Sequence, residues 1–528
     1  MKPLSQHWAD QAANRIINQQ GDKELYTLAS GITPSGLVHV GNFREVITVD
    51  LVSRALEARG KQVRFVYSWD DFDTFRKVPK NIPNKEEFKP HLHKPISRIP
   101  DPWQKADSYS AGITQTFVEE LKQLGIEPEY IYQEKQYANT IYAKEIRHAL
   151  ENVDTIKSIL NKSRTTPLAD NWLPTVIYCS KCQSDEMSYQ KYLGDWDYGY
   201  KCASCGHEET IQINETKNLK LVWRVDWPMR WSFENVDFEP GGKDHSSRGG
   251  SYDTGCEIIE KLWGKKAPIY LQYDFVKIKG GSGKMSSSSG ELLTLGEIGR
   301  IYEPQMIRWI FANQRPNHDF AISLDEDVIK VYDEFDRAEE KSWSIDSVTA
   351  SSKDLLRLRV QQLSAVDKVK PYKQIKRPAF RLLCNRLQIC GGNIERTFEK
   401  FYQKDYSNEN LHSAFLARAT RAMNWLKLYA PEEFKYHLHD KPVHIELSSE
   451  EHKALTSFRE LIKDLEIENL DPKEINDLIW SKCLNQTSCE PKAFYKIIYQ
   501  KLIGRDQGPR LPSFIKEIGQ EKILSLLE

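Results

Sequence analysis

The sequence has no long apolar run and almost no net charge. Nothing in its 528 residues approaches the roughly 18 consecutive apolar residues that a membrane-spanning helix needs, and no apolar core follows Met1 as it would in a signal peptide. The formal net charge is −1, so a contact with nucleic acid would have to come from local basic patches. These absences favour a cytoplasmic protein without a membrane partner.

Cysteine is sparse except in one segment. Four of the nine cysteines form two C-x-x-C pairs, in which Cys179 and Cys182 are followed by Cys202 and Cys205. Thiolates at this spacing can bind one zinc ion tetrahedrally, and four of them leave no coordination position for water, which makes such a site structural. Four buried thiols without a metal are the alternative. We predict an inserted, zinc-ribbon-like module over residues 171–218, with these four cysteines as the Zn²⁺ ligands.

The first strong pattern is a glycine-rich turn between a strand-like segment and a helical one. Leu25–Ala29 is short and apolar, like a buried strand, and the turn follows at Gly31–Asn42. Beyond the turn, apolar residues recur at every fourth position, as on one face of a helix: Phe43, Ile47, Leu51 and Ala55. A second strand-like stretch follows at Val63–Tyr67. This order predicts a βαβ unit with parallel strands, and ligands in such sheets bind beyond the carboxyl ends of the strands.

The residues of this turn suit a phosphate group. Gly31 and Gly41 allow backbone N–H groups to approach a ligand closely, and the start of the following helix offers unpaired N–H groups and a positive dipole end. His39 adds a side-chain donor just before that helix. An ordinary glycine turn with a packed histidine is the alternative.

A second glycine-rich segment lies far downstream. Ile269–Ile278 is apolar and strand-like, and Gly280–Ser289 follows it with a lysine and several hydroxyl groups. Lys284 supplies a mobile positive charge suited to a phosphate, and the serines supply donors. A flexible Gly/Ser linker is the alternative.

Together the two segments resemble the paired signatures of the class I aminoacyl-tRNA synthetases. His39–Asn42 is similar to the HIGH motif, and Lys284–Ser288 is similar to the KMSKS motif. Both depart from the pattern, since Asn42 replaces the second histidine and Ser287 replaces the second lysine. Within class I, Thr33–Gly36 and the serine run most resemble the lysyl enzymes, and the resemblance covers nearly the whole chain.

The resemblance implies a function and a set of site residues. It implies that ATP, with Mg²⁺, activates L-lysine and that tRNA(Lys) accepts the lysyl group. The implied catalytic residues are His39, Asn42, Lys284, Ser286 and Ser287. The residues implied for ATP are Thr33, Pro34, Gly41, His245 and Met285. Those implied for the amino acid are Gly31, Thr33, Asp70, Asp71, Trp223, Asp226, His245 and Tyr273.

Some of these assignments also depend on local sequence. Asp70 and Asp71 end the second predicted strand at the ligand crevice, where they could bind an ammonium group, although a helix cap or a solvated loop fits them equally well. If Leu221–Trp231 contains a strand, Pro228 would end it, and strict alternation would place Trp223 and Asp226 on opposite faces. A structural role for its tryptophans is an equally good interpretation.

The predicted fold is a multidomain α/β protein. Residues 1–170 and 219–290 are expected to form the two halves of a Rossmann-type parallel-sheet catalytic core around the inserted module, and residues 291–350 a connecting helical segment. The remaining residues, 351–528, have a helical pattern, which the resemblance identifies as an all-α anticodon-binding cage. We therefore expect contacts with both the acceptor end and the anticodon of tRNA, and a monomeric protein.

Three other functions are compatible with parts of the pattern. A glutamyl- or glutaminyl-type synthetase would share the fold but would need a cationic pocket for a side-chain carboxylate. A nucleotidyltransferase that makes a cofactor uses a similar turn but needs no long helical C-terminal region. An inactive RNA-binding paralogue would not need His39 and Lys284.

Overall fold

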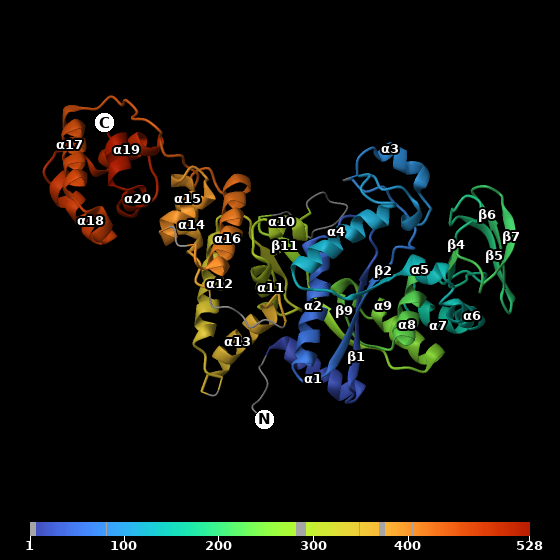
Figure 1. The fold of residues 1–528 in the computed structure, drawn as a ribbon. Helices are drawn as coiled ribbons and strands as arrows, with labels where there is room; N and C mark the ends of the chain where they lie inside the picture. Colours follow the sequence, from blue (N-terminus) through green and yellow to red (C-terminus); the bar gives the residue numbers. More distant parts are fainter. Residues whose placement is uncertain (1–6, 81, 281–291, 348, 369–374, 404–405) are drawn as a thin grey trace. The chain divides into compact units, whose positions relative to one another are not determined.

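The chain divides into two compact units. The first unit comprises Met1–Ile322 and Lys341–Tyr372, and the second comprises Ser323–Glu340 and Lys373–Glu528. The computed structural model, drawn in Figure 1, describes residues 7–80, 82–280, 292–347, 349–368, 375–403 and 406–528.

A five-stranded parallel sheet forms the centre of the first unit. Its order is β10 (Ile269–Tyr273), β9 (Val236–Gly242), β1 (Leu25–Ile32), β2 (Gln62–Trp69) and β3 (Glu129–Tyr132). The chain adds β2 and β3 on one side of β1 and adds β9 and β10 on the other. Ligands bind at such a switch point, beyond the carboxyl ends of the strands. The predicted βαβ unit and the Rossmann-type core are confirmed.

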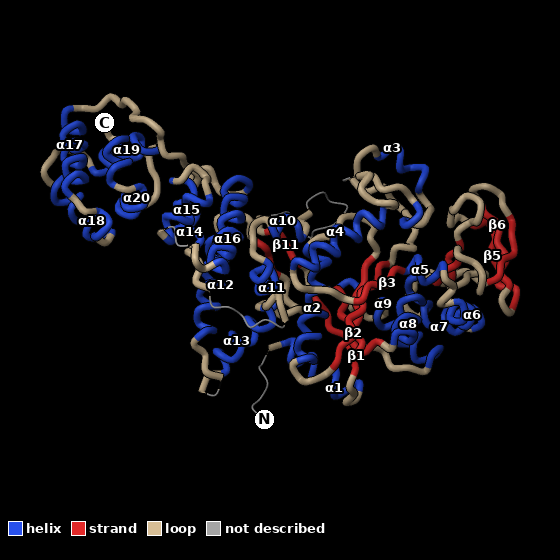
Figure 2. Tube along the Cα trace, in the orientation of Figure 1, coloured by secondary structure: helices blue, strands red, loops and turns tan. Residues whose placement is uncertain are grey.

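Helices pack around this sheet, which stands out among the blue helices in Figure 2. The central one is α2 (Val40–Glu57), which contacts β1, β2 and β9. Its side chains are buried almost without interruption from Phe43 to Leu56, so the helix is held by packing on several sides. The other helices of the first unit are α1 (Trp8–Gln20), α3 (Lys85–Phe88), α4 (Tyr109–Gln123), α5 (Gln133–Ala138), α6 (Ala143–Glu151), α7 (Val153–Asn161), α8 (Trp223–Glu234), α9 (Ser251–Ile258), α10 (Leu295–Gly299), α11 (Pro304–Ala312) and α13 (Ser352–Ser364).

An inserted module carries the four clustered cysteines. It contains a three-stranded antiparallel sheet of β5 (Met187–Gly194), β6 (Asp197–Cys202) and β7 (Glu208–Gln212). Antiparallel strands β4 (Thr175–Ile177) and β8 (Leu219–Leu221) close its base. A further pair, β11 (Val276–Ile278) and β12 (Phe320–Ile322), is parallel and follows the core sheet in sequence.

The interpretation of the segment before Pro228 as a strand is wrong. The chain is helical from Trp223, as α8, and only the preceding β8 is extended. The alternation of apolar and polar residues imitated a strand, but the tryptophans at 223, 227 and 231 lie four residues apart and share one helix face, as shown by their ring contacts. Asp226 and Arg230 also form a 3.1 Å ion pair across one helical turn. Pro228 is accommodated inside the helix.

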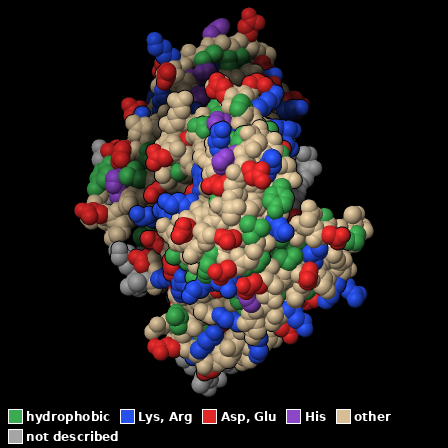
Figure 3. All heavy atoms as spheres, turned by 90° about the vertical axis from the view of Figure 1, so that its right-hand side faces the viewer, with side chains coloured by type: hydrophobic (Ala, Val, Ile, Leu, Met, Phe, Trp, Pro, Cys, Tyr) green, Lys and Arg blue, Asp and Glu red, His purple; other side chains and the backbone are tan. Residues whose placement is uncertain are grey.

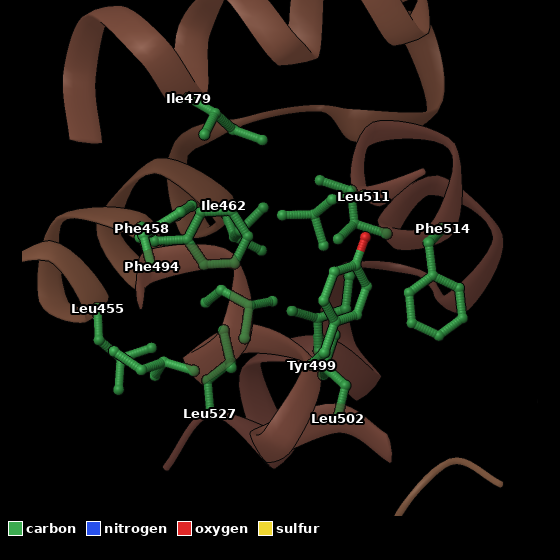
Figure 4. Close-up of a cluster of buried hydrophobic side chains, with 14 of the residues drawn as sticks. Leu455, Phe458, Ile462, Ile479, Phe494, Tyr499, Leu502, Leu511, Phe514 and Leu527 are labelled. Atoms are coloured by element: carbon green, nitrogen blue, oxygen red, sulfur yellow. The ribbon is translucent and has the colours of Figure 1, made fainter. Parts of the chain in front are cut away.

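The described residues of the second unit form helices and loops only. The helices are α12 (Asp327–Trp343), whose last turn extends into the first unit, α14 (Phe380–Ile389), α15 (Ile394–Tyr402), α16 (Glu409–Leu428), α17 (Ser449–Asp464), α18 (Pro472–Ile479), α19 (Pro491–Ile503), α20 (Leu511–Ile518) and α21 (Gln520–Leu526). Figure 4 shows a core within this unit, in which Phe458 of α17 and Phe494 of α19 pack edge to face. Leu502, Leu511 and Phe514 belong to the same buried cluster. The predicted all-α C-terminal region agrees with this architecture.

Among the residues that the structure describes, none of the helices has the length and apolar character needed to cross a bilayer. Basic and acidic side chains are interspersed over the face drawn in Figure 3, in keeping with the net charge of −1.

Candidate active site and cysteine cluster

The start of α2 lies beyond the carboxyl end of β1, where the sequence predicted a phosphate site. His39 is the N-cap of the helix: its Nδ1 accepts a 3.1 Å hydrogen bond from the Gly41 N–H, and Asn42 Oδ1 accepts from the His39 N–H at 3.2 Å. A Cβ on Gly41 would lie only 2.8 Å from the His39 ring, so a larger residue there would displace the imidazole. The cap fixes the turn and leaves the amide NH₂ of Asn42 as its donor group. The structure thus brings His39, Gly41 and Asn42 together.

A carboxylate that the sequence analysis missed lies one turn further along α2. Glu45 Oε1 accepts from the Ser30 hydroxyl at 2.9 Å and from the Gly31 N–H at 3.1 Å, and Oε2 accepts from the Tyr273 hydroxyl at 2.6 Å. Burial raises the pKa of Glu45, while these three donors oppose the rise. Two residues predicted for the amino acid, Gly31 and Tyr273, therefore meet at Glu45. The only signal in the sequence was its spacing of three residues from Asn42, on the same helix face.

A stack of aromatic rings lies at the crevice near the carboxyl end of β9. Trp223 and Trp227 of α8 stack with ring centroids 5.3 Å apart, and the His245 ring lies 5.4 Å from that of Trp223. Behind them, the indole N–H groups of Trp227 and Trp231 donate to Glu239 at 3.0 and 2.5 Å. The predicted pair Trp223 and His245 is thus adjacent, and it presents apolar ring surface at the crevice.

Two of the predicted ammonium-binding carboxylates belong to a buried ion network. Arg230 contacts Asp70 at 2.7 Å and Asp226 at 3.1 Å, and the Tyr137 hydroxyl donates to Asp226 as well. Asp70 also accepts from Ser68 at 3.2 Å. Both carboxylates are thus already engaged by one guanidinium group, and a ligand ammonium would have to compete with Arg230 for either of them.

Asp71, Thr33 and Pro34, which were also predicted as site residues, lie in the first glycine-rich turn and directly after β2. Asp71 points to α5, where its Oδ1 accepts from the Glu134 N–H at 2.8 Å, and burial raises its pKa to about 7. Thr33 donates to Asp73 at 2.7 Å, and Pro34 next to it is buried. The residues predicted in the second glycine-rich segment lie outside the described residues: Lys284, Met285, Ser286 and Ser287.

The four cysteines of the inserted module converge. Their Sγ atoms all lie within 4.8 Å of one another, with Cys182 and Cys202 at 3.5 Å and Cys179 and Cys205 at 3.7 Å. A tetrahedral zinc ion with Zn–S bonds of about 2.3 Å would separate its sulfur ligands by roughly 3.8 Å, so the residues fit a Cys₄ metal site. His207 is turned towards Glu209, 3.3 Å away, and is not part of this group.

The family model described as tRNA synthetases class I (K) matches residues 6–367. The chain belongs to the class I lysyl-tRNA synthetase family. As a member it is an ATP-dependent synthetase, and its cysteine cluster has the donor set of a metal site.

Relatives of similar length resemble the chain from end to end. A lysine–tRNA ligase of Treponema pallidum (strain Nichols) is 40% identical over 527 residues, which is 99% of this chain and 98% of the relative. One from Thermococcus kodakarensis (strain ATCC BAA-918 / JCM 12380 / KOD1) is 41% identical over 529 residues, 99% of each chain. Among solved structures, a glutamate tRNA ligase from Elizabethkingia meningosepticum in complex with its amino acid is 13% identical, covers 96% of this chain and 98% of its own, and has a TM-score of 0.45.

Proposed function

We propose that the chain attaches L-lysine to tRNA(Lys) in two steps. First, a carboxylate oxygen of lysine attacks the α-phosphorus of ATP, and pyrophosphate leaves as lysyl-adenylate forms. A hydroxyl group of the terminal ribose of tRNA then attacks the lysyl carbonyl carbon, and AMP leaves with the bonding electrons. The structural observation that carries this proposal is the buried carboxylate of Glu45 at the crevice. The full-length relatives named as lysine–tRNA ligases support it.

The amino-acid site follows from the chemistry of the lysine side chain. Its methylene stem needs an apolar wall, which Trp223 beside His245 supplies, and an ammonium group needs a carboxylate. Glu45 suits this role better than Asp70 or Asp226, because both of these already form ion pairs with Arg230. In this proposal Gly31 and Tyr273 act by orienting Glu45.

ATP is proposed to bind at the start of α2. The N-terminal end of a helix attracts phosphate oxygens, and the side chains of His39 and Asn42 place donors there, while Gly41 leaves room for a ligand beside them. Charge that develops on the α-phosphate in the first step would be stabilised by these fixed donors, without any side chain acting as a nucleophile. Thr33, Pro34 and His245 are proposed to border the rest of the nucleotide, and Lys284 to Ser287 to approach its phosphates. Mg²⁺ would be held mainly by ATP oxygens.

The other partners are proposed from the family. A zinc ion on Cys179, Cys182, Cys202 and Cys205 would have a structural role, since four thiolates leave no position for a reacting group. The second unit is proposed to read the anticodon, and the inserted module to contact the acceptor end of tRNA. The protein is proposed to work as a monomer.

The choice of amino acid distinguishes this proposal from a glutamyl-type enzyme. The side-chain carboxylate of a glutamate substrate would be repelled by the carboxylate of Glu45. The only guanidinium group among the site residues described above belongs to Arg230, which is already paired with Asp70 and Asp226. Amino-acid-dependent exchange of pyrophosphate into ATP, with tRNA present, tests this. Lysine-dependent exchange supports the proposal. Glutamate-dependent exchange would assign the glutamyl function instead. If no amino acid supported exchange, the proposed synthetase activity would be contradicted.

A further inference from the structure

A buried carboxylate that takes no part in the proposed reaction lies behind the apolar wall of the lysine site. Glu239 belongs to β9, the strand between β1 and β10, and its exposed fraction is 8%. Its Oε1 accepts from the Trp227 indole N–H at 3.0 Å, and its Oε2 accepts from the Trp231 indole N–H at 2.5 Å. We propose that Glu239 is a positioning residue for lysine, because it orients the aromatic rings against which the lysine stem packs. This inference rests on the proposed function.

The two indoles call for a carboxylate and not merely for a polar side chain. Trp227 and Trp231 are one helical turn apart on α8, so both N–H groups reach the same residue of β9. A carboxylate is purely an acceptor and offers one oxygen to each donor. A glutamine at position 239 would have a single acceptor oxygen, and its NH₂ group would face the other indole N–H. Only the acid satisfies both rings.

The orientation of Trp227 determines that of the ring at the crevice. The ring planes of Trp223 and Trp227 are 17° apart and their centroids are 5.3 Å apart, so a rotation of one ring breaks the stack unless the other follows. The His245 ring contacts both of them, at 5.4 Å from Trp223 and 6.1 Å from Trp227. Trp227 is buried, whereas Trp223 is partly exposed. Glu239 therefore acts on the lysine wall through Trp227.

Packing alone does not fix the Trp227 ring. A small cavity of about 30 Å³ adjoins it, which is enough for a water molecule and hence for some movement of the ring. Trp231 is held more tightly, because Gly255 of α9 lies so close that a Cβ there would be 2.9 Å from the Trp231 ring. The hydrogen bond to Glu239 is therefore what fixes the plane of Trp227, and loss of this bond should change the orientation of Trp223.

The predicted effect is specific to the amino acid. A methylene stem gains from ring surface that is already in place, because an oriented wall lowers the entropy cost of binding. Glu45, the proposed partner of an ammonium group, is held by other donors, from Ser30, Gly31 and Tyr273. Loss of the Glu239 contact should therefore weaken the packing of the stem and leave the site for the ammonium group intact.

The first test compares two buried glutamates. Glu239→Gln should raise the KM for lysine roughly tenfold in pyrophosphate exchange with tRNA present, while kcat and the KM for ATP stay close to the wild type. The matched control is Glu339→Gln, since Glu339 is a buried glutamate of the second unit that pairs with Arg377. A purely structural defect would reduce the fraction of active enzyme, and so lower the apparent kcat, without a change in the KM for lysine.

The second test is a rescue. In the double variant Glu239→Gln with Trp231→Phe, the competing indole N–H is absent, so the glutamine oxygen can accept from Trp227. The KM for lysine should then return most of the way to the wild-type value. If Glu239→Gln fails to fold, the tryptophans decide: Trp227→Phe should raise the KM for lysine, and Trp231→Phe alone should not.

Three results would overturn the inference: an unchanged KM for lysine in Glu239→Gln, an equal rise in Glu339→Gln, or no rescue in the double variant. Equal KM values in Trp227→Phe and Trp231→Phe would overturn it as well. Failure of the proposed function is distinct, because the wild type itself would then support no lysine-dependent exchange.

Discussion

The hydroxyl group of Tyr273 donates a 2.6 Å hydrogen bond to Glu45, and this contact joins the end of β10 to the second turn of α2. Ser30 and the Gly31 N–H bind the other oxygen of the same carboxylate. Three donors from two strands thus hold one acidic group at the point where the strand order reverses. Such a group is a ready partner for an ammonium group, whose binding would in turn favour the ionised carboxylate.

Substitution Glu45→Gln should weaken lysine use selectively. The amide keeps an oxygen for Ser30 and Gly31 but loses the charge, and a hydrogen bond to a charged group contributes about 1.5–3 kcal/mol. We expect kcat/KM for lysine to fall roughly 10- to 150-fold in pyrophosphate exchange with tRNA present, with little change in the KM for ATP. Glu57→Gln, at the far end of the same helix, is the control. Equal effects of the two substitutions would show that Glu45 does not contact lysine.

Removal of Arg230 should destabilise the first unit. Arg230→Met leaves Asp70 and Asp226 buried without their cation, and breaking a buried ion pair from one side costs about 3–5 kcal/mol. Arg64→Met removes a partly exposed partner of Glu129 and Glu234 and should cost no more than about 1 kcal/mol. Urea unfolding followed by tryptophan fluorescence measures both. A small loss for Arg230→Met would mean that its two carboxylates take up protons or find other partners.

Glu239 should make stability depend on pH. Burial raises its pKa to about 7 from 4.5, despite the two indole donors. A raised pKa in the folded state favours folding below pH 4.5, and this contribution is lost as the pH rises through 7. Relative to Glu239→Gln, the wild type should therefore lose up to about 3 kcal/mol of unfolding free energy between pH 4.5 and pH 7.5, at about 1.36 kcal/mol per pKa unit. Parallel pH profiles of the two proteins would contradict this.

The cysteine cluster should hold one zinc ion in the purified protein. Cys202→Ser removes a buried ligand and should abolish stoichiometric zinc, with loss of protease resistance in the inserted module. Cys256→Ser, outside the cluster, should keep the metal. Elemental analysis by mass spectrometry counts the zinc. A wild-type protein without zinc, or a Cys202→Ser protein that retains it, would exclude the Cys₄ assignment.

The parts of the fold that could be predicted are those with local signals. The turn before α2 was predicted from His39 and Gly41, and the two C-x-x-C pairs predicted the cluster of four cysteines. The strand interpretation around Trp223 is wrong because a short segment can show both the two-residue alternation of a strand and the four-residue spacing of a helix. The stacking of Trp223 on Trp227 and the Asp226–Arg230 ion pair, which are visible only in the structure, show that the segment is a helix.

Glu45 could not be predicted from the sequence, because its environment is set by tertiary contacts. A glutamate within a helix is ordinarily a solvent-facing residue. Its role depends on Tyr273, 228 positions away, and on the crossing of α2 over the strand ends. The same holds for Asp70, which forms an ion pair with Arg230, a residue distant in the sequence. Pairing between remote segments decides which carboxylates remain available to a ligand.

Direct analysis of charged tRNA tests the central claim most sharply. The purified protein is incubated with ATP, Mg²⁺, tRNA and the twenty amino acids, and the amino acid esterified to the recovered tRNA is identified by mass spectrometry. We predict lysine on tRNA(Lys) and no other aminoacyl ester. Glutamate on its tRNA, or uncharged tRNA with the wild-type protein, would contradict the assignment.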